Sequence, residues 1–464
     1  MKKFISVALV ASILSLNFSP AVFAVENQKK FKSSASKEKS SPDAYKFDYV
    51  NLKFWEDFND ETLNKYIKQA VLNNHDLKMA SLSVDQYREN VKMQFAGELP
   101  SAVIGGFGGI EKPIGSTSTQ GLFATPAIVS YELDIFGKNH NKTKAVKKLY
   151  EKSKQDEKTA YIAIASAVGT TYFNIVLLDE TIRLQEEIVA LREQIYNLMV
   201  LRNQEGLTST SDTVKANKDF VQGGICLLDL EQKRANLLNL LAVLIGETSE
   251  NSSSFERSSL SEIANLNTAP ESIPTEIITQ RPDYIVAELM VEKAGLDVKV
   301  AKKELLPAFN IGGVALFYSS GLGNLFNVSN ALLALAGGAL WPIFSGGRLM
   351  ANMRSKKLAY ESVLENYLKT NLVAIQEVND ALVNLKINNK KLEKTIEQAG
   401  LEQVELDYSI AKYNEGIISK LDLIQYEENL LSINKLVAQE KTQEFIDFIE
   451  LYKSTGNQPY AKVQ

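Results

Sequence analysis

The sequence predicts a mainly α fold that also carries a membrane β-barrel. Three observations predict it: two proline-free runs of nearly 70 residues, two pairs of short segments with strand-like patterning, and a duplication that places one run and one pair in each half of the chain. Ordinary globular helices seldom exceed about 25 residues, so runs of this length indicate coiled-coil-like packing. Four strands are too few to close a barrel that admits a solute, so several chains would have to pool their strands.

The N-terminus has the pattern of a secretory signal peptide, which we assign to residues 1–24. Two lysines precede an apolar run of about 13 residues, and a small-x-small cleavage pattern ends at Ala24. The alternative, a membrane anchor helix, needs about 20 apolar residues. Cleavage before Val25 leaves no cysteine at the new N-terminus to carry a lipid. Residues 25–48 are rich in Lys and Ser, so we expect a flexible lead-in.

Composition excludes several classes of protein. The 464 residues carry a formal net charge of −5, so we expect no nucleic acid as a partner. After the signal peptide we expect no stretch of 18 or more apolar residues, which argues against a helical membrane protein but not against a closed β-barrel, whose strands need only about 10 residues. The single cysteine, Cys226, excludes an intrachain disulfide, and we expect it to be a buried helix residue.

The chain contains an internal duplication with a spacing of about 207 to 210 residues. Markers of the first copy return in the same order in the second: His75-Asp76 and Arg281-Pro282-Asp283, Leu99-Pro100 and Leu306-Pro307, Phe136-Gly137-Lys138 and Phe344-Ser345-Gly346-Gly347-Arg348, Glu205-Gly206 and Glu415-Gly416, Asp212 and Asp422. So many markers at a nearly constant offset are not expected by chance. We therefore assign a first repeat to residues 49–260 and a second to residues 261–464.

Each repeat is predicted to run helix, strand pair, long helix, helix. The first repeat has an expected β-hairpin at 100–135, a long helix at 138–205 and a further helix at 208–246. The second has an expected helix at 283–305, a β-hairpin at 307–344, a long helix at 348–415 and a helix at 419–455. A helix of about 68 residues reaches roughly 100 Å, which one compact domain cannot bury.

The second strand of the first hairpin alternates between two faces. Phe123, Ala127, Val129, Tyr131 and Leu133 fall on one face, and Ser130, Glu132 and Asp134 fall on the other. A membrane barrel with a wet interior and a half-buried soluble sheet both produce this pattern.

Both long runs carry apolar residues at coiled-coil spacing. The stripes are Leu184, Ile188, Leu191, Ile195 and Leu198 in the first run, and Leu368, Leu372, Ile375, Val378, Leu382 and Leu385 in the second. We expect both stripes to form core packing.

A series of short motifs follows in a fixed order along nearly the whole mature chain. They are Trp55-Glu56-Asp57-Phe58, Asn74-His75-Asp76-Leu77, Ser130-Tyr131-Glu132-Leu133-Asp134-Ile135-Phe136-Gly137, Arg281-Pro282-Asp283, Pro342-Ile343-Phe344-Ser345-Gly346-Gly347 and Leu451-Tyr452-Lys453. Together they resemble the TolC/OprM-type outer-membrane efflux proteins, the outer membrane factor family, and most closely its drug and metal efflux branch.

The resemblance implies a homotrimer in the cell outer membrane. Each chain would give four strands to a 12-stranded barrel and its helices to a periplasmic tunnel. The implied partners are a periplasmic adaptor (membrane fusion) protein, an inner-membrane transporter of the RND type and outer membrane lipid. The expected function is passive conduction of drugs, toxic compounds or metal ions to the exterior. The duct of a type I protein-secretion system remains open as an alternative, and the duplicated hairpins argue against a trimeric coiled-coil adhesin.

The resemblance places the functional residues at the two helix-to-helix turns of the tip, Gly206 and Gly416. Tyr413 and Asp212 match positions at which TolC-like proteins hold the tip shut through a Tyr–Asp hydrogen bond. Asp422 matches an acidic ring residue, and three such carboxylates near one axis would repel each other and attract cations.

Two features leave the gate open to other interpretations. Asp212 and Asp422 could instead be N-caps of the helices that follow the glycine turns. Ile418 and Gln425 depart from the family pattern, which has an arginine and a second aspartate there, so we expect a less charged gate.

The sequence shows no catalytic constellation. His75 and His140 lie far apart, and HExxH, CxxC and GxSxG motifs do not occur. The glycine-rich segment 105–109 lacks the Lys-Ser/Thr pair that a phosphate loop requires. We therefore expect no enzyme activity, no cofactor and no metal site.

Overall fold

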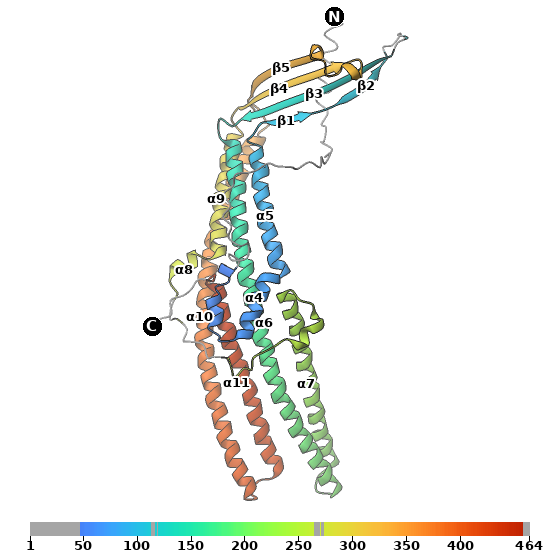
Figure 1. Ribbon diagram of the computed structural model, residues 1–464. Helices are drawn as coiled ribbons and strands as arrows, with labels where there is room; N and C mark the ends of the chain where they lie inside the picture. The colour runs from blue at the N-terminus through green and yellow to red at the C-terminus, as the bar shows by residue number, and fades with distance from the viewer. Residues whose placement is uncertain (1–46, 113–116, 118, 264–269, 271–272, 458–464) are drawn as a thin grey trace. The chain divides into compact units, whose positions relative to one another are not determined.

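The computed structural model describes residues 47–112, 117, 119–263, 270 and 273–457, and these belong to one compact unit, Asp43–Gln464 (Figure 1). The predicted signal peptide, with Ala24 and Val25, lies outside the described residues. So does the lead-in, except for its last two positions.

The first half of the chain places a sheet segment between two sets of helices. Helices α3 (Leu52–Glu56), α4 (Glu61–Asn73) and α5 (His75–Ala96) precede strands β1 (Ser101–Ile104), β2 (Phe107–Glu111) and β3 (Gln120–Leu133). Helices α6 (Lys138–Gln204) and α7 (Thr210–Ile245) follow, and then the 3-10 helix η1 (Ser249–Ser254).

The second half repeats this order. It contains α8 (Thr275–Thr279), α9 (Pro282–Lys303), β4 (Ala308–Ser319), η2 (Leu322–Asn324), η3 (Val328–Asn330), β5 (Ala331–Leu340), α10 (Arg348–Asn414) and α11 (Lys420–Ser454). The two long helices α6 and α10 each have 67 residues, which corresponds to about 100 Å of helix. Figure 1 shows the strands at one end of these helices and the α6–α7 and α10–α11 turns at the other.

The strands form one antiparallel sheet. Strands β1 and β2 both pair with β3, which pairs with β4, which pairs with β5. The first strand of the hairpin that we predicted at 100–135 is split into two. The interruption lies opposite Pro126, whose nitrogen cannot donate to a neighbouring strand, although its carbonyl accepts a hydrogen bond from the Gly105 N–H at 2.9 Å.

The predicted alternation on β3 needs one correction. Tyr131 lies opposite Ile311, and Glu132 lies opposite Asn310, so the apolar and polar faces continue onto β4. Asp134, however, lies beyond the end of β3 at Leu133. Its carboxylate accepts a hydrogen bond from the His140 N–H at 2.7 Å and so stabilises the start of α6. Asp134 is therefore a helix-start residue and not a strand residue.

The hydrophobic core joins the two ends of the described chain around the middle of α6. Trp55 and Phe58 pack with Phe173 of α6 and with Phe445 and Tyr452 of α11. The Phe173 and Phe445 ring centroids are 4.8 Å apart. This core fixes the position of α6 at the centre of the chain.

One expectation about hydropathy and one about burial were wrong. Helix α6 contains an 18-residue window apolar enough to cross a membrane, although we expected none, and 61% of that window is buried inside the structure. Because it is largely covered by other parts of the chain, the window belongs to a core helix. Cys226, expected to be buried, is exposed on α7, since the face of α7 on which it lies is not covered within the chain.

Candidate functional site

The turns that end α6 and α10 have the same backbone geometry. Gly206 and Gly416 each have a φ of 72°, in the left-handed region that favours glycine. Leu207 N–H donates to the Arg202 carbonyl at 2.8 Å, and Ile417 N–H donates to the Lys412 carbonyl at 2.8 Å. This six-to-one hydrogen bond is the Schellman motif, which closes a helix C-terminus and reverses the chain.

The helices that follow both turns begin with a capping box. The Asp212 N–H donates to Ser209 Oγ at 3.1 Å, and Ser209 Oγ donates to Asp212 Oδ2 at 2.7 Å. The Asp422 N–H donates to Ser419 Oγ at 3.2 Å, and Ser419 Oγ donates to Asp422 Oδ2 at 2.7 Å. These boxes satisfy backbone donors that would otherwise lack partners at a helix start.

The capping boxes lower the pKa values of the two aspartates. The Ser209 hydroxyl holds the pKa of Asp212 below its usual value, and the Ser419 hydroxyl does the same for Asp422. The N-cap residues are the two serines, so the alternative that the aspartates are themselves the N-caps is wrong. The aspartates occupy the third helical position and act as the reciprocal partners of the caps.

Tyr413 lies one turn before the second tip and is 38% exposed. The Lys420 ammonium lies 5.7 Å from the centre of its ring, within range of a cation–π interaction. The Asp212 carboxylate accepts from Thr208 as well as from Ser209. Within one chain, Tyr413 and Asp212 contact these local partners and not each other, so the Tyr413–Asp212 hydrogen bond remains a prediction.

The two departures from the family pattern lie beside the second tip. Ile418 is half-buried between the glycine turn and Ser419. Gln425 is exposed and donates to Asn429 Oδ1 at 3.1 Å. Neither brings a charge to the tip.

Sequence reasoning missed four residues that shape the tips. Ser209 and Ser419 are the caps, and a Ser-x-x-Asp signature at each site could have identified them. Leu207 and Ile417 directly follow the tip glycines and are 68% and 71% exposed. Each turn therefore presents one large apolar side chain to its surroundings.

The sheet is open at both edges within one chain. Among the described residues, β5 pairs only with β4, and β1 and β2 pair only with β3. Every residue of β5 is exposed, including Leu333 and Leu335 at 73% and 79%. Unpaired strand edges and an uncovered apolar strand require further contacts, from neighbouring strands or from lipid.

The helices next to the sheet also lack packing partners on their outer sides within one chain. They pack in the order α5, α6, α9, α10, so α5 and α10 are the outer members. Both outer helices expose apolar residues: Met79, Leu82 and Met93 on α5, and Leu358, Leu368 and Leu372 on α10. Leu368 and Leu372 belong to the stripe that we expected to be packed in the core. The N-terminal part of that stripe, which is nearer the sheet, is exposed within one chain, whereas Val378 and Leu385 farther along α10 are buried.

In the part of the chain that the structure describes, no three His, Cys, Asp or Glu side chains gather in an arrangement that could hold a metal ion.

Comparison with known proteins finds one family across most of the chain. A family model described as outer membrane efflux protein matches residues 66–247 and 273–457. The probable efflux pump outer membrane protein TtgC of Pseudomonas putida is 26% identical over 409 residues, which cover 86% of this chain and 84% of that protein. The cation efflux system protein CusC of Escherichia coli is 25% identical over 427 residues, which cover 88% of this chain and 89% of that protein.

Solved structures share the fold. The Campylobacter jejuni CmeC outer membrane channel superimposes with a TM-score of 0.79 at 23% identity, and the match covers 94% of both chains. A structure of CusC superimposes with a TM-score of 0.75 over 86% of this chain. These likenesses confirm the predicted fold class, in which long helices build a tunnel and a few strands contribute to a membrane barrel.

Proposed function

The chain belongs to the outer membrane efflux protein family, and from this premise we propose that it is the outer membrane channel of a tripartite efflux pump. The observation that carries the proposal is the open sheet joined directly to two 67-residue helices. A sheet with two free edges satisfies its backbone when several chains close it into a barrel, and the attached helices then enclose a continuous passage.

The proposed assembly is a homotrimer with a 12-stranded barrel. The outer strand β5 of one chain would pair with β1 and β2 of the next, and the exposed apolar face of α10 would pack on that of α5. Leu368 and Leu372 would then become part of a core, as coiled-coil spacing requires. Closed point-group symmetry lets identical chains share one such interface without leaving free edges.

The proposed partners are a periplasmic adaptor and an inner-membrane transporter of the RND type. Leu207 and Ile417 are exposed at the two turns, which lie at the end of the long helices opposite the strands (Figure 1), and are suited to contact an adaptor.

The proposed clients are small molecules or metal ions. Relatives include proteins named as toluene, solvent and antibiotic efflux components and others named as cation efflux components. The channel itself would conduct passively, because the pump supplies the energy and a wide passage needs no specific pocket.

Entry at the tip is proposed to be gated by Tyr413, Asp212 and Asp422. The lowered pKa of both aspartates keeps their carboxylates negative at neutral pH. In a trimer, three copies of Asp422 near the axis would attract cations, as rings of carboxylates do in other channels.

The test is accumulation of a panel of dyes, antibiotics and metal ions in cells lacking the gene, with and without complementation. Build-up of several unrelated small molecules that complementation clears supports the proposal, and the panel then identifies the clients. If none accumulates but a secreted protein disappears from the medium, the chain is the duct of a type I secretion system and the efflux proposal is wrong.

A further inference from the structure

The register of the sheet assigns the strand residues to two faces, because directly paired residues of antiparallel strands project to the same face. Ser130 of β3 lies opposite Ser101 of β1, and their hydroxyl oxygens are 2.8 Å apart. Glu132, on the same face of β3, lies opposite Asn310 of β4. The lipid side of a membrane barrel disfavours charge, whereas its interior accepts it. In the proposed barrel this face is therefore the interior one, and we call it the inner face.

The inner face is polar next to the helices and becomes apolar farther along the strands. Glu132 forms an ion pair with Lys138 of α6 at 2.6 Å. Beyond Ser130 come three rows of paired residues, which we call the apolar rows: Val103, Ile128, Val314 and Ala334, then Gly105, Pro126, Leu316 and Leu332, then Phe107, Ala124 and Tyr318. The Tyr318 hydroxyl is the one polar side-chain group that the described residues bring to these rows.

Closing the sheet into a barrel would not cover the apolar rows. Val103, Phe107 and Leu332 are exposed within one chain. Pairing with the strands of a neighbouring chain satisfies the backbone at the sheet edges but leaves the faces of the strands uncovered. Successive rows are about 7 Å apart along a strand, so the three rows extend over about 14 Å. The interiors of membrane barrels are usually polar, so an apolar stretch of this length is an unusual lining for a passage.

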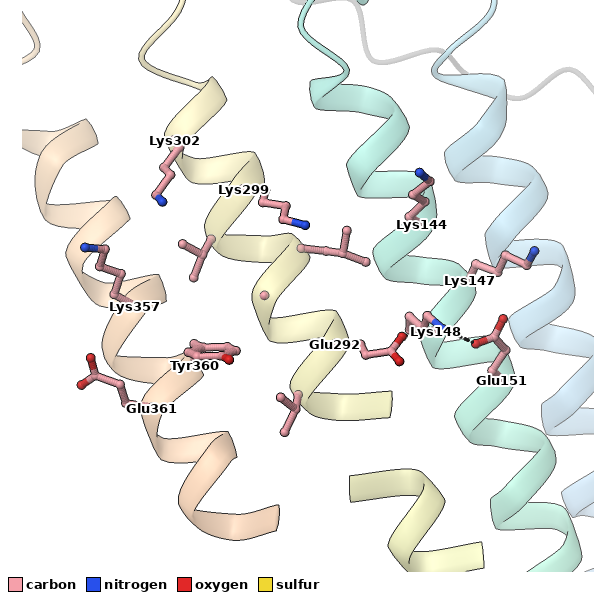
Figure 2. A pocket seen from close by; sticks show the side chains of 14 residues that line it. Lys144, Lys147, Lys148, Glu151, Glu292, Lys299, Lys302, Lys357, Tyr360 and Glu361 are labelled. Carbon is pink, nitrogen blue, oxygen red and sulfur yellow. Dashed lines mark hydrogen bonds and ion pairs between the residues drawn. The ribbon is translucent and has the colours of Figure 1, made fainter. Parts of the chain in front are cut away.

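Charge is plentiful in other parts of the chain, of which 23% is charged. On the helices next to the sheet, lysine and glutamate side chains predominate around a shallow cavity of about 900 Å³ (Figure 2). There Lys148 pairs with Glu151 at 2.8 Å and with Glu292 at 2.6 Å. The lack of charge in the apolar rows is therefore a property of this part of the sheet and not of the overall composition.

From this arrangement we propose that the apolar rows form a hydrophobic section of the exit passage and that the clients of the channel are lipophilic or amphiphilic organic molecules. The inference rests on the proposed channel function and narrows its client class. A molecule that lies against the rows buries apolar surface, and each CH₂ group taken out of water contributes about fourfold in affinity. The described residues of the rows offer no carboxylate, imidazole or sulfur ligand, so a metal ion gains no binding from them.

The test measures block of the K⁺ current through the full-length protein in a planar bilayer. The blockers are symmetric tetraalkylammonium ions, from tetraethylammonium to tetrapentylammonium, added on the barrel side. Every member carries one positive charge, so Glu132 attracts all of them alike. A change in blocking affinity along the series therefore reports apolar contact and not charge.

Three variants locate that contact. The first makes the inner face polar and is I128T/L316T/L332T. The matched control makes the same kind of change on the opposite face of the same strands and is V129T/I311T/L333T. The third keeps the inner face apolar and is I128V/L316M/L332M. Light scattering in detergent checks that each variant forms the same assembly as the wild type, and if the triple threonine variants do not, the single changes L316T and I311T carry the comparison.

The wild type is expected to bind tetrapentylammonium at least about tenfold more tightly than tetraethylammonium, because the longer arms bury additional CH₂ groups. In I128T/L316T/L332T this ratio is expected to fall to about twofold. The matched control and I128V/L316M/L332M are expected to keep a ratio within about twofold of the wild-type value, since both retain the apolar rows.

Equal affinity of the wild type for the short and the long ions would overturn the proposal. So would a dependence on chain length that survives in I128T/L316T/L332T, or one that the matched control loses to the same extent. All of these results require a current, so they leave the channel function standing. A complete absence of K⁺ current would instead contradict the proposed channel and, with it, the inference.

Discussion

Helices α6 and α10 have the same length and occupy corresponding places in the two repeats, yet their surroundings differ. Of 67 residues each, α6 buries 20 and α10 buries 8. Helix α6 packs extensively against α4, α5, α7, α9 and α11, whereas α10 packs mainly against α9 and α11. The two copies of the duplicated unit therefore share the same order of elements but differ in how much of the long helix is buried. The long helix of the first copy builds the core of the chain, and that of the second exposes an apolar face within the single chain.

The single glycine inside each long helix illustrates the same difference. A Cβ atom at Gly169 of α6 would lie 2.5 Å from Trp55 Cζ3 and 2.9 Å from Ile449 Cδ1. A Cβ atom at Gly400 of α10 would meet nothing within 4 Å. Glycine is required for close packing at the first position and only lowers helix stability at the second.

A change that disrupts the core around α6 should reduce stability the most. Gly169→Ala should lower the free energy of unfolding by about 3 kcal/mol, because the new methyl group collides with the buried Trp55 ring. Gly400→Ala is the matched control and should raise stability by up to about 1 kcal/mol. Thermal unfolding followed by circular dichroism at 222 nm measures both. An unchanged melting temperature for Gly169→Ala would contradict the packing described for α6.

The next effect concerns the uncovered face of α10. Leu368→Glu combined with Leu372→Glu should prevent trimer formation, because both side chains are exposed in one chain and would be buried between chains at about 1.5–3 kcal/mol each. Light scattering in detergent measures the mass of the assembly. Glu365→Gln, an exposed change on the same helix, should leave the trimer intact. A trimer that survives the double glutamate change would exclude this face as the interface.

A smaller effect, on conductance, tests the predicted hydrogen bond between the two tips. Tyr413→Phe with Asp212→Ala should raise conductance in a planar bilayer by about fivefold, since one hydrogen bond contributes about 1 kcal/mol to the closed state. Ser209→Ala removes the cap but keeps the carboxylate, so it should leave conductance unchanged. If the double variant conducts like the wild type, the proposed gate does not exist.

The smallest effect concerns α11, the partner of α10. Burial raises the pKa of Glu444 and of Asp447, so the folded chain holds these protons more tightly than the unfolded chain. Their unfavourable contribution is absent below the ordinary carboxyl pKa of about 4.5 and grows as the pH rises through the folded value. Stability should therefore fall with rising pH in that window.

Glu444→Gln tests whether the stability of the fold falls as the buried carboxyl group ionises. It should flatten the pH dependence of the melting temperature between about pH 4.5 and 7 and raise the melting temperature at pH 7 by about 1–2 °C. Glu405→Gln, on an exposed part of α10, should do neither. A steeper slope in Glu444→Gln would show that the buried carboxylate stabilises the fold in its charged form.

The fold class and the order of elements could be predicted because they depend on local signals. Proline-free length, heptad spacing and repeated markers such as Gly206 and Gly416 do not require knowledge of neighbouring segments. The split between β1 and β2 could not be predicted in this way, because it depends on Pro126 lying across the sheet. Asp134 was assigned to the strand for a related reason. The alternation of apolar and polar residues continues in the sequence past Leu133, where the pairing of β3 stops.

Burial was the least predictable property. Coiled-coil spacing marks Leu372 and Leu385 equally, but only Leu385 is covered within the chain. Cys226 lies on a helix whose apolar residues suggested a core position, yet it is exposed. Periodicity identifies an apolar face, whereas the segment that covers the face is decided by contacts between distant parts of the chain or between chains.

The contact between the two ends of the described chain has a consequence for folding. The Tyr452 hydroxyl donates to the Val50 carbonyl at 2.8 Å across 402 positions of sequence. Contacts of such high order form slowly, because a long loop must close before they contribute any stabilisation. The aromatic core therefore cannot be completed until almost the entire polypeptide has been delivered to the compartment where it folds. Until then Trp55 and Phe58 lack their C-terminal neighbours Tyr452 and Phe445, so part of their apolar surface is still uncovered in the incomplete chain.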